Sequence, residues 1–374
     1  SQSGTEVVVA DSADPATIDA MVASTRVLIH LAGPYARHGE GLVRACVRHG
    51  THYIDLTGEM NFVAGMIAAH HRAAEQAGVK IVHSAGFEAL PFDLCVLACV
   101  RRLGEELATA TRSVDLVLTS EAPAGVGPKD ALSGGTVNTM RETLAAEPAP
   151  GVDDPALLIE ERDEAAAVRR HSPLEVGAWH DREFDEFIAP LVPSPYINPM
   201  IIHRSASLWA RAGRPYGARL RYREGTRAAA SARPRLATRL SATVASGAHR
   251  SMFWVMTRSA GARALLLALV DRFGPRTGEG PSERALAQWR YRIDAHAEGE
   301  SGARVWLRLE GDAHPGYRST ARMIVEAGLS LAFDEGLPPI YGVVTPASAL
   351  GLPMLARLVD AGITTKFVGE GVHS

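Results

Sequence analysis

The stretch from residue 7 to residue 35, VVVADSADPATIDAMVASTRVLIHLAGPY, decides the fold. Two short apolar runs, 7–10 and 27–32, flank a segment that opens with Asp14-Pro15. Asp is a favoured helix N-cap and Pro a favoured first helical residue, so this segment predicts a helix. Short apolar runs without alternation are typical of parallel strands that are buried on both faces. The stretch therefore predicts a strand–helix–strand unit.

The same alternation continues to about residue 102. Apolar runs at 52–56 and 79–84 predict two further strands, and the segments 40–49, 62–76 and 91–102 predict helices. Four strand–helix units with short connections predict a doubly wound parallel sheet. Ligands of such sheets bind at the carboxyl ends of the strands. That rule selects four loops: Asp11-Ser12, Gly33-Pro34-Tyr35, Thr57-Gly58-Glu59 and Ser84-Ala85-Gly86-Phe87.

The rest of the chain has a different pattern. Alternating runs at 113–119, 289–297 and 303–310 predict strands of an antiparallel or mixed sheet, and 317–333 predicts a helix. The predicted class is α/β: a Rossmann-like parallel sheet in 1–108, without its first strand–helix units, and a second α+β domain in 109–337. A C-terminal helix and strand in 338–374 are expected to pack back on the first domain.

Composition indicates a soluble globular protein with a sizeable core, because 46% of the residues are hydrophobic and 22% are charged. Three cysteines are too few for a disulfide framework, and a reducing cytoplasm is the expected location. No metal-binding motif is visible, so no metal is expected. No glycine-rich phosphate loop precedes the first strand, which leaves open whether this chain by itself is active.

An arginine-rich segment spans residues 203–276, with 15 arginines and only two acids. Codon bias explains why the cations are arginine but not why acids are scarce. The alternative is a basic surface for an acidic acyl carrier protein, a phosphate-bearing ligand or an anionic membrane. Within the segment, residues 251–273 predict either a core helix or a helix in a membrane interface, which would place the protein peripherally at a membrane. No nucleic-acid motif accompanies the arginines, and a homodimer is left open.

Several motifs, taken together, resemble the saccharopine dehydrogenase-like oxidoreductases, and most closely their trans-acting enoyl reductase branch. The motifs are Gly33-Pro34-Tyr35, His52–Glu59, His83–Phe87 with Pro91 and Asp93, Ser133-Gly134-Gly135-Thr136, Tyr216-Gly217, Gly278–Pro281, His314–Tyr317 and Thr345-Pro346-Ala347. The resemblance implies an oxidoreductase that uses NADP or NAD. It implies reduction of an enoyl thioester, in trans, during lipid or polyketide assembly. The alternatives are a saccharopine-type imine or amino-acid reductase and a non-catalytic membrane-associated or scaffolding protein.

The strand-end loops supply the candidate site residues. For catalysis we single out three: the Tyr35 hydroxyl could polarise a carbonyl, Glu59 could act as a general acid, and Ser84 could donate to an oxyanion. Each has a structural alternative: an aromatic lid, a helix-start carboxylate and a tight turn. For the cofactor the candidates are Asp11, Gly33, Pro34, Thr57, Gly58 and Gly86. For the substrate they are Ser133, Gly134, Gly135, Thr136 and Tyr317, in segments that resemble anion cradles at helix starts.

Overall fold

The computed structural model describes residues 6–126, 141, 151–191, 193–228, 235–273 and 280–372. The N-terminal half contains α1 (Pro15–Ala23), β1 (Val27–His30), α2 (Tyr35–His49), β2 (His52–Asp55), α3 (Met60–Gln76), β3 (Lys80–Val82), α4 (Leu90–Arg101), η1 (Arg102–Glu106), β4 (Thr111–Glu121), α7 (Arg162–His171), β5 (Trp179–Asp181) and β6 (Glu186–Ile188). After it come η2 (Ser194–Tyr196), α8 (Asn198–Arg211), β7 (Arg221–Ala228), α9 (Arg235–Arg258), α10 (Ala260–Phe273), α11 (Glu283–Gln288), β8 (Arg290–Gly299), β9 (Ala303–Gly311), η3 (Pro315–Ser319), α12 (Thr320–Phe333), β10 (Gly342–Val344), α13 (Pro346–Leu350), α14 (Pro353–Asp360) and β11 (Ile363–Val372).

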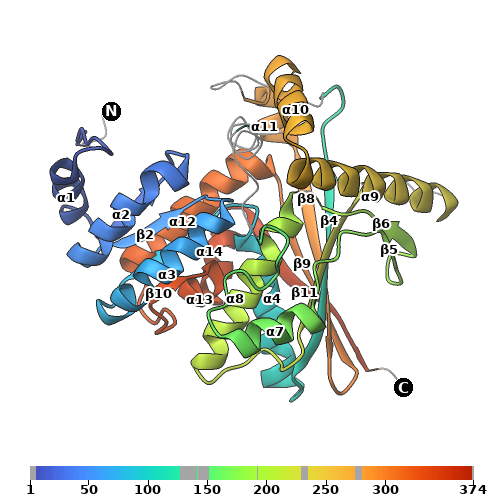
Figure 1. Cartoon of the computed structure of the whole chain (residues 1–374). Coiled ribbons are helices and arrows are strands. Elements are labelled where there is room, and N and C mark those ends of the chain that lie inside the picture. Colours follow the sequence, from blue (N-terminus) through green and yellow to red (C-terminus); the bar gives the residue numbers. More distant parts are fainter. Residues whose placement is uncertain are drawn as a thin grey trace.

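A four-stranded parallel sheet forms the first unit, in the order β1-β2-β3-β10. Alternate residues of a strand face opposite sides of the sheet. Tyr53 and Ile81 therefore pack with α2 and α3, whereas Ile54 and Val82 pack with α12. β10 comes from the C-terminal part of the chain and closes this sheet beside β3 (Figure 1).

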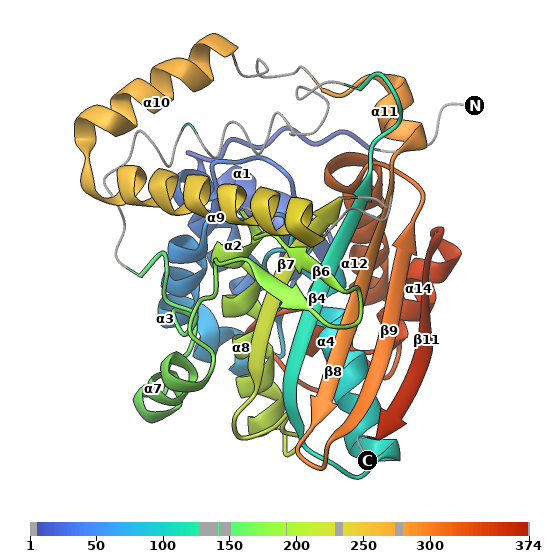
Figure 2. The same ribbon diagram turned by 90° about the vertical axis from the view of Figure 1, so that its right-hand side faces the viewer.

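A mixed five-stranded sheet forms the second unit, in the order β11-β9-β8-β4-β7. All pairs are antiparallel except β4 with β7. Its inner face packs on α4, whose twelve residues are all buried, and its long strands lie side by side in Figure 2. The predicted α/β class, with a parallel sheet and a second mixed sheet, is confirmed.

The strand predicted at Val7–Ala10 is wrong. This segment has extended or irregular backbone, and Val7 and Val9 are 87% and 88% exposed. A strand needs a neighbour that takes up its hydrogen bonds. Among the described strands none pairs with this segment, and β1 pairs only with β2.

The interpretation of residues 251–273 as a core helix is also wrong. The segment belongs to two helices, α9 and α10, that meet at Ser259. Trp254, Leu265 and Leu269 are 55%, 65% and 45% exposed. Among the helices that the structure describes, none combines the length and apolarity needed to cross a bilayer.

Candidate active site

Asp55 is the centre of a buried polar network at the carboxyl ends of the parallel strands. The residue ends β2 and is 0% exposed. Its Oδ1 accepts hydrogen bonds from the backbone N–H groups of Thr57 and Ser84, at 3.0 and 3.1 Å. Its Oδ2 accepts from the Tyr53 hydroxyl at 2.9 Å and from His83 Nδ1 at 2.7 Å. One carboxylate therefore fixes the loops that follow β2 and β3, which are two of the loops selected from the sequence.

The network extends to β1 through aromatic side chains. Because the Tyr53 hydroxyl donates to Asp55, it accepts from His30 Nδ1 at 2.8 Å. The Tyr35 hydroxyl donates to the His30 carbonyl at 3.3 Å, and its ring meets the His30 ring edge-on at 5.0 Å. Burial raises the pKa of Tyr35 above its usual range and lowers that of His30. The hydroxyl of Tyr35 thus faces the protein interior, beside the strand ends.

Glu59 connects the second loop to the first. Its two carboxylate oxygens accept from the backbone N–H groups of Tyr35 and Ala36, at 2.9 and 2.8 Å. These are the first two residues of α2, whose N-terminal N–H groups lack partners within the helix. α2 therefore starts at Tyr35, five residues before the predicted start, because a carboxylate 24 positions along the chain caps it. Glu59 therefore has the expected role at a helix start, but the helix that it caps is α2 and not α3, which follows it in the sequence.

Ser84 occupies the left-handed region of the backbone, with φ of 59°. Its hydroxyl donates to the Thr57 carbonyl at 2.6 Å, so it joins the same two loops as Asp55. A non-glycine residue in this region is held there by its surroundings, and such positions are frequent at functional sites. Gly86, two residues later, packs closely against Leu56. A Cβ at this position would lie 2.9 Å from Leu56 Cδ2.

The backbone after β1 is open to solvent. Leu31 is 61% exposed, and Gly33 is also exposed. Gly33 and Pro34 lead into Tyr35, so this open turn lies next to the Asp55 network. An exposed turn at the carboxyl edge of a parallel sheet fits the close approach of a dinucleotide.

The structure does not join all candidates to this network. The Asp11 carboxylate accepts from the backbone N–H of Ala13 at 2.9 Å, in an exposed turn. Tyr317 lies in η3 against His314, with ring centroids 5.6 Å apart, and η3 leads to Thr320, which accepts from the backbone N–H of Phe87. Ser133, Gly134, Gly135 and Thr136 lie outside the described residues.

Sequence reasoning singled out the strand-end motifs but missed the residues that organise them. Asp55 and His83 lie inside the quoted motifs. The signal that could have identified Asp55 is a carboxylate as the last residue of a strand predicted to be buried. His83 Nε2 is buried and has no hydrogen-bond partner among the described residues.

A second polar cluster joins β7 to α8 and was also missed. Glu224 of β7 is 3% exposed, and its Oε2 accepts from Asn198 Nδ2 and from the Tyr222 hydroxyl, both at 2.7 Å. Burial raises the pKa of Glu224 to about 8. The Ser194 hydroxyl donates to Glu88 at 2.6 Å, and burial raises the pKa of Glu88.

This second cluster adjoins the strand-end site on two sides. Glu88 belongs to the loop that follows Ser84 and Gly86. Asn198 follows Ile197, whose Cδ1 would lie 3.1 Å from a Cβ on Gly58. The second cluster therefore lies next to both loops that Asp55 fixes.

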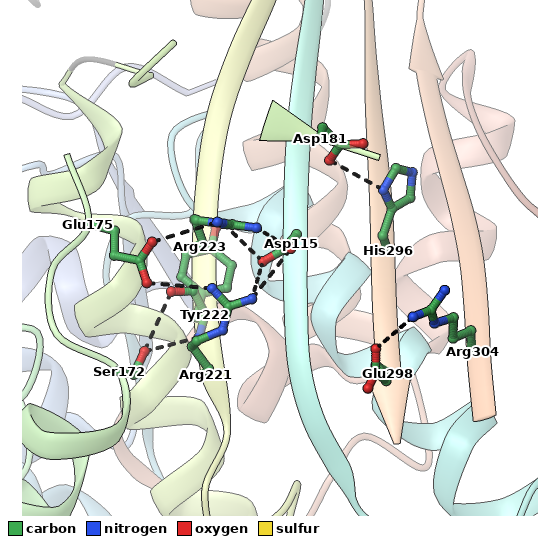
Figure 3. Close-up of polar contacts among 10 residues, drawn as sticks. All are labelled: Asp115, Ser172, Glu175, Asp181, Arg221, Tyr222, Arg223, His296, Glu298 and Arg304. Atoms are coloured by element: carbon green, nitrogen blue, oxygen red, sulfur yellow. Dashed lines mark hydrogen bonds and ion pairs between the residues drawn. The ribbon is translucent and has the colours of Figure 1, made fainter. Parts of the chain in front are cut away.

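The arginine-rich segment engages acids of the same chain in many places. Arg221 and Arg223 both pair with Asp115, at 3.1 and 2.6 Å, and both approach Glu175 (Figure 3). Arg227 pairs with Glu186 at 3.0 Å. The acids that balance these arginines lie outside the segment, which is why the segment alone has a strong positive charge.

A surface groove of about 820 Å³ lies where this segment meets the end of β8. Arg112, Arg219 and His171 line it together with Glu298 and Glu300. Arg112 approaches Glu298 at 3.4 Å. Arg304 also reaches Glu298, at 3.3 Å (Figure 3). The groove presents both signs of charge rather than a uniformly basic surface.

Comparisons with known proteins complete this description. Residues 2–82 match the family described as saccharopine dehydrogenase NADP binding domain. A trans-acting enoyl reductase of Mycobacterium tuberculosis is 34% identical over 379 residues, covering 96% of this chain and 84% of that protein. The chain belongs to the trans-acting enoyl reductase family. The corresponding protein of Mycobacterium leprae is 32% identical over 367 residues, with the same coverage of both chains.

A solved saccharopine dehydrogenase (L-Glu forming) of Saccharomyces cerevisiae aligns with a TM-score of 0.45 and 11% identity, covering 96% of this chain and 88% of that one. The family match and the relatives make the chain an oxidoreductase of a family that binds NADP, as the motifs predicted.

Proposed function

We propose that this chain reduces the carbon–carbon double bond of an α,β-unsaturated acyl thioester, in trans, during the assembly of a lipid or polyketide. The curated relatives carry the name of trans-acting enoyl reductase. The observation that carries the proposal is the Asp55 network, which joins two loops by hydrogen bonds at the edge where parallel sheets bind dinucleotides.

The residues after β1 and β2 fit the cofactor. The exposed turn at Gly33-Pro34 and the loop at Thr57-Gly58 would hold the dinucleotide, and Gly86 would lie beside its reactive ring. When bound, the nicotinamide supplies the hydride that the β-carbon accepts.

The remaining candidates orient and polarise the substrate. The Gly86 amide is the strand-end group proposed to donate toward a thioester oxygen, because the Ser84 hydroxyl already donates to the Thr57 carbonyl at 2.6 Å. Tyr35 and Glu59 are already engaged within the protein, at the His30 carbonyl and at the start of α2. We therefore assign both residues to positioning the Gly33-Pro34 turn, and Glu59→Gln tests whether Glu59 also acts as the acid.

The competing amino-acid reductase needs cationic side chains for substrate carboxylates. Within the described residues, the hydrogen-bonding partners of Asp55, Ser84 and Glu59 include no arginine or lysine. A thioester substrate carries no carboxylate at its reacting end, so turnover with each substrate class separates the two functions.

The test is substrate discrimination. The purified chain is given NADPH with an enoyl-pantetheine thioester, or with an amino acid and a 2-oxo acid, and loss of the reduced nicotinamide is followed. Turnover with the thioester alone supports the proposal, and turnover with the amino acid and 2-oxo acid alone overturns it. Asp55→Asn is the site variant. Asp312→Asn, at a 59% exposed side chain paired with Arg322, is the matched control.

A further inference from the structure

The helix α9 has an inverted amphipathic pattern. Among the side chains that the structure describes, those that α9 buries are small or polar: Thr238, Ala242, Ser246 and His249 are 6%, 2%, 8% and 4% exposed. A surface helix of a globular protein ordinarily turns its large apolar residues toward the core. This helix does the opposite.

Polar contacts fix this orientation of α9. The Tyr196 hydroxyl bonds to His249 Nε2 at 2.7 Å, and Tyr196 stacks on Phe253 with ring centroids 5.0 Å apart. Near the other end of the helix, Thr238 Oγ1 accepts from the backbone N–H of Phe187 in β6 at 3.4 Å. Rotating α9 to bury its apolar side would break these contacts.

The outward face of α9 carries large apolar side chains. Leu236, Leu240 and Val244 are 76%, 65% and 63% exposed. Their spacing of four residues places them on one side of the helix, and Trp254, eighteen residues after Leu236, returns to the same side after five full turns. We call Leu236, Leu240, Val244 and Trp254 the α9 apolar stripe.

The next helix extends the exposed apolar surface. Leu265 and Leu269 of α10 are also spaced by four residues and are 65% and 45% exposed. α10 lies at the top of the molecule in Figures 1 and 2, and α9 lies below it, against β6. A monomeric soluble protein rarely leaves such a surface uncovered.

The charges around the stripe identify the occupant. From residue 235 to residue 273 the sequence contains six arginines and one acid, Asp271. Asp271 is paired with Arg141 at 2.8 Å. Arg239 and Arg250 are exposed on α9 itself. An apolar face with a tryptophan, flanked by arginines and free of unpaired acid, is the pattern of helices that lie in the interface of an anionic bilayer.

We propose that α9 and α10 dock this protein on an anionic phospholipid surface, with the α9 apolar stripe entering the boundary between headgroups and acyl chains. The arginines draw the protein to the lipid headgroups, and the stripe holds it there. This attachment does not depend on the proposed reaction, and its test uses no catalytic readout.

The test is flotation of the full chain with vesicles. One set contains phosphatidylcholine alone, and the other contains phosphatidylcholine with phosphatidylglycerol. We expect binding to the anionic vesicles that weakens as salt rises. The triple variant L236Q/L240Q/V244Q should bind roughly 100-fold more weakly, since three exposed apolar side chains no longer enter the bilayer.

A matched control changes exposed apolar residues elsewhere. Val325, Leu329 and Val359 are 48%, 40% and 46% exposed on α12 and α14, and V325Q/L329Q/V359Q should bind like the unchanged protein. A blue shift of tryptophan fluorescence on vesicle addition should disappear in Trp254→Phe.

Equal binding of the two triple variants would overturn the proposal. So would a protein that ignores anionic vesicles but forms a dimer that L236Q/L240Q/V244Q dissociates, because the stripe would then be an interface between two copies of this chain.

Discussion

The buried carboxyl group of Glu224 gives a pH dependence of stability whose sign and size follow from the structure. Burial, with a further contribution from the charge of Glu88, raises its pKa from 4.5 to about 8. Between these two values the folded protein keeps a proton that the unfolded chain releases. Stability therefore falls as pH rises through this window and levels off above about pH 8.

The magnitude follows from the two pKa values. Each pKa unit corresponds to about 1.4 kcal/mol, so the whole window contributes of the order of 5 kcal/mol. This is large beside the roughly 5–15 kcal/mol that holds a typical domain folded. Glu224→Gln removes the titrating group and keeps an oxygen that can accept from Asn198 Nδ2 and the Tyr222 hydroxyl.

The assay is urea unfolding of both proteins across this pH range. We expect similar midpoints at about pH 5, and a higher midpoint for Glu224→Gln above about pH 8. Glu310→Gln, at a 42% exposed side chain 4.0 Å from Lys366, is the control and should follow the unchanged protein. Parallel curves for the unchanged protein and Glu224→Gln would refute the reasoning, because Glu224 would then titrate alike in both states.

Three further substitutions test the site and its supports. Asp55→Asn should lower stability by about 2–3 kcal/mol and turnover at least about tenfold, because an amide cannot accept all four hydrogen bonds; thermal unfolding and NADPH oxidation measure the two effects. Glu59→Gln should cost about 1 kcal/mol through the start of α2 and leave most turnover intact, whereas a loss of turnover at unchanged stability would make Glu59 the acid. Lys80→Met should cost about 2–4 kcal/mol, because Lys80 Nζ donates to the carbonyls of Pro338, Ile340 and Ala349 at 2.5, 3.0 and 3.1 Å; a denaturation midpoint that stays unchanged would contradict this.

Three strands of the parallel sheet, β1, β2 and β3, were predictable from short apolar runs that lead to Gly, Pro or Asp. The strand β10 was not predicted, because its three residues lie far along the chain from the other strands. The hairpin of β8 and β9 was predictable from the alternation of apolar and polar residues on both sides of the turn at Glu298–Gly302. The strand β7 was not predicted, because its sequence is rich in charged residues and does not alternate apolar with polar residues. Its arginines pair with acids distant in the sequence, and its Glu224 is buried. Only the tertiary structure reveals which charges are neutralised.

The site was partly predictable for a similar reason. The parallel-sheet rule selected the loops at Thr57 and Ser84, and both meet at Asp55. The contact of Glu59 with the start of α2 spans 24 residues, and no local pattern encodes it. The two interpretations of residues 251–273 covered only Trp254 of the α9 apolar stripe, and the part of α9 that carries Leu236, Leu240 and Val244 was not predicted. Periodicity shows that a helix has an apolar face but not which way that face points.

The most direct test of the central claim is a titration of this chain with NADPH by calorimetry, followed by turnover with an enoyl-pantetheine thioester. The account predicts binding that Asp55→Asn weakens and Asp312→Asn does not, and one saturated thioester formed for each NADPH oxidised. Absence of NADPH binding by a folded chain, or NADPH oxidation without a saturated thioester, would contradict it.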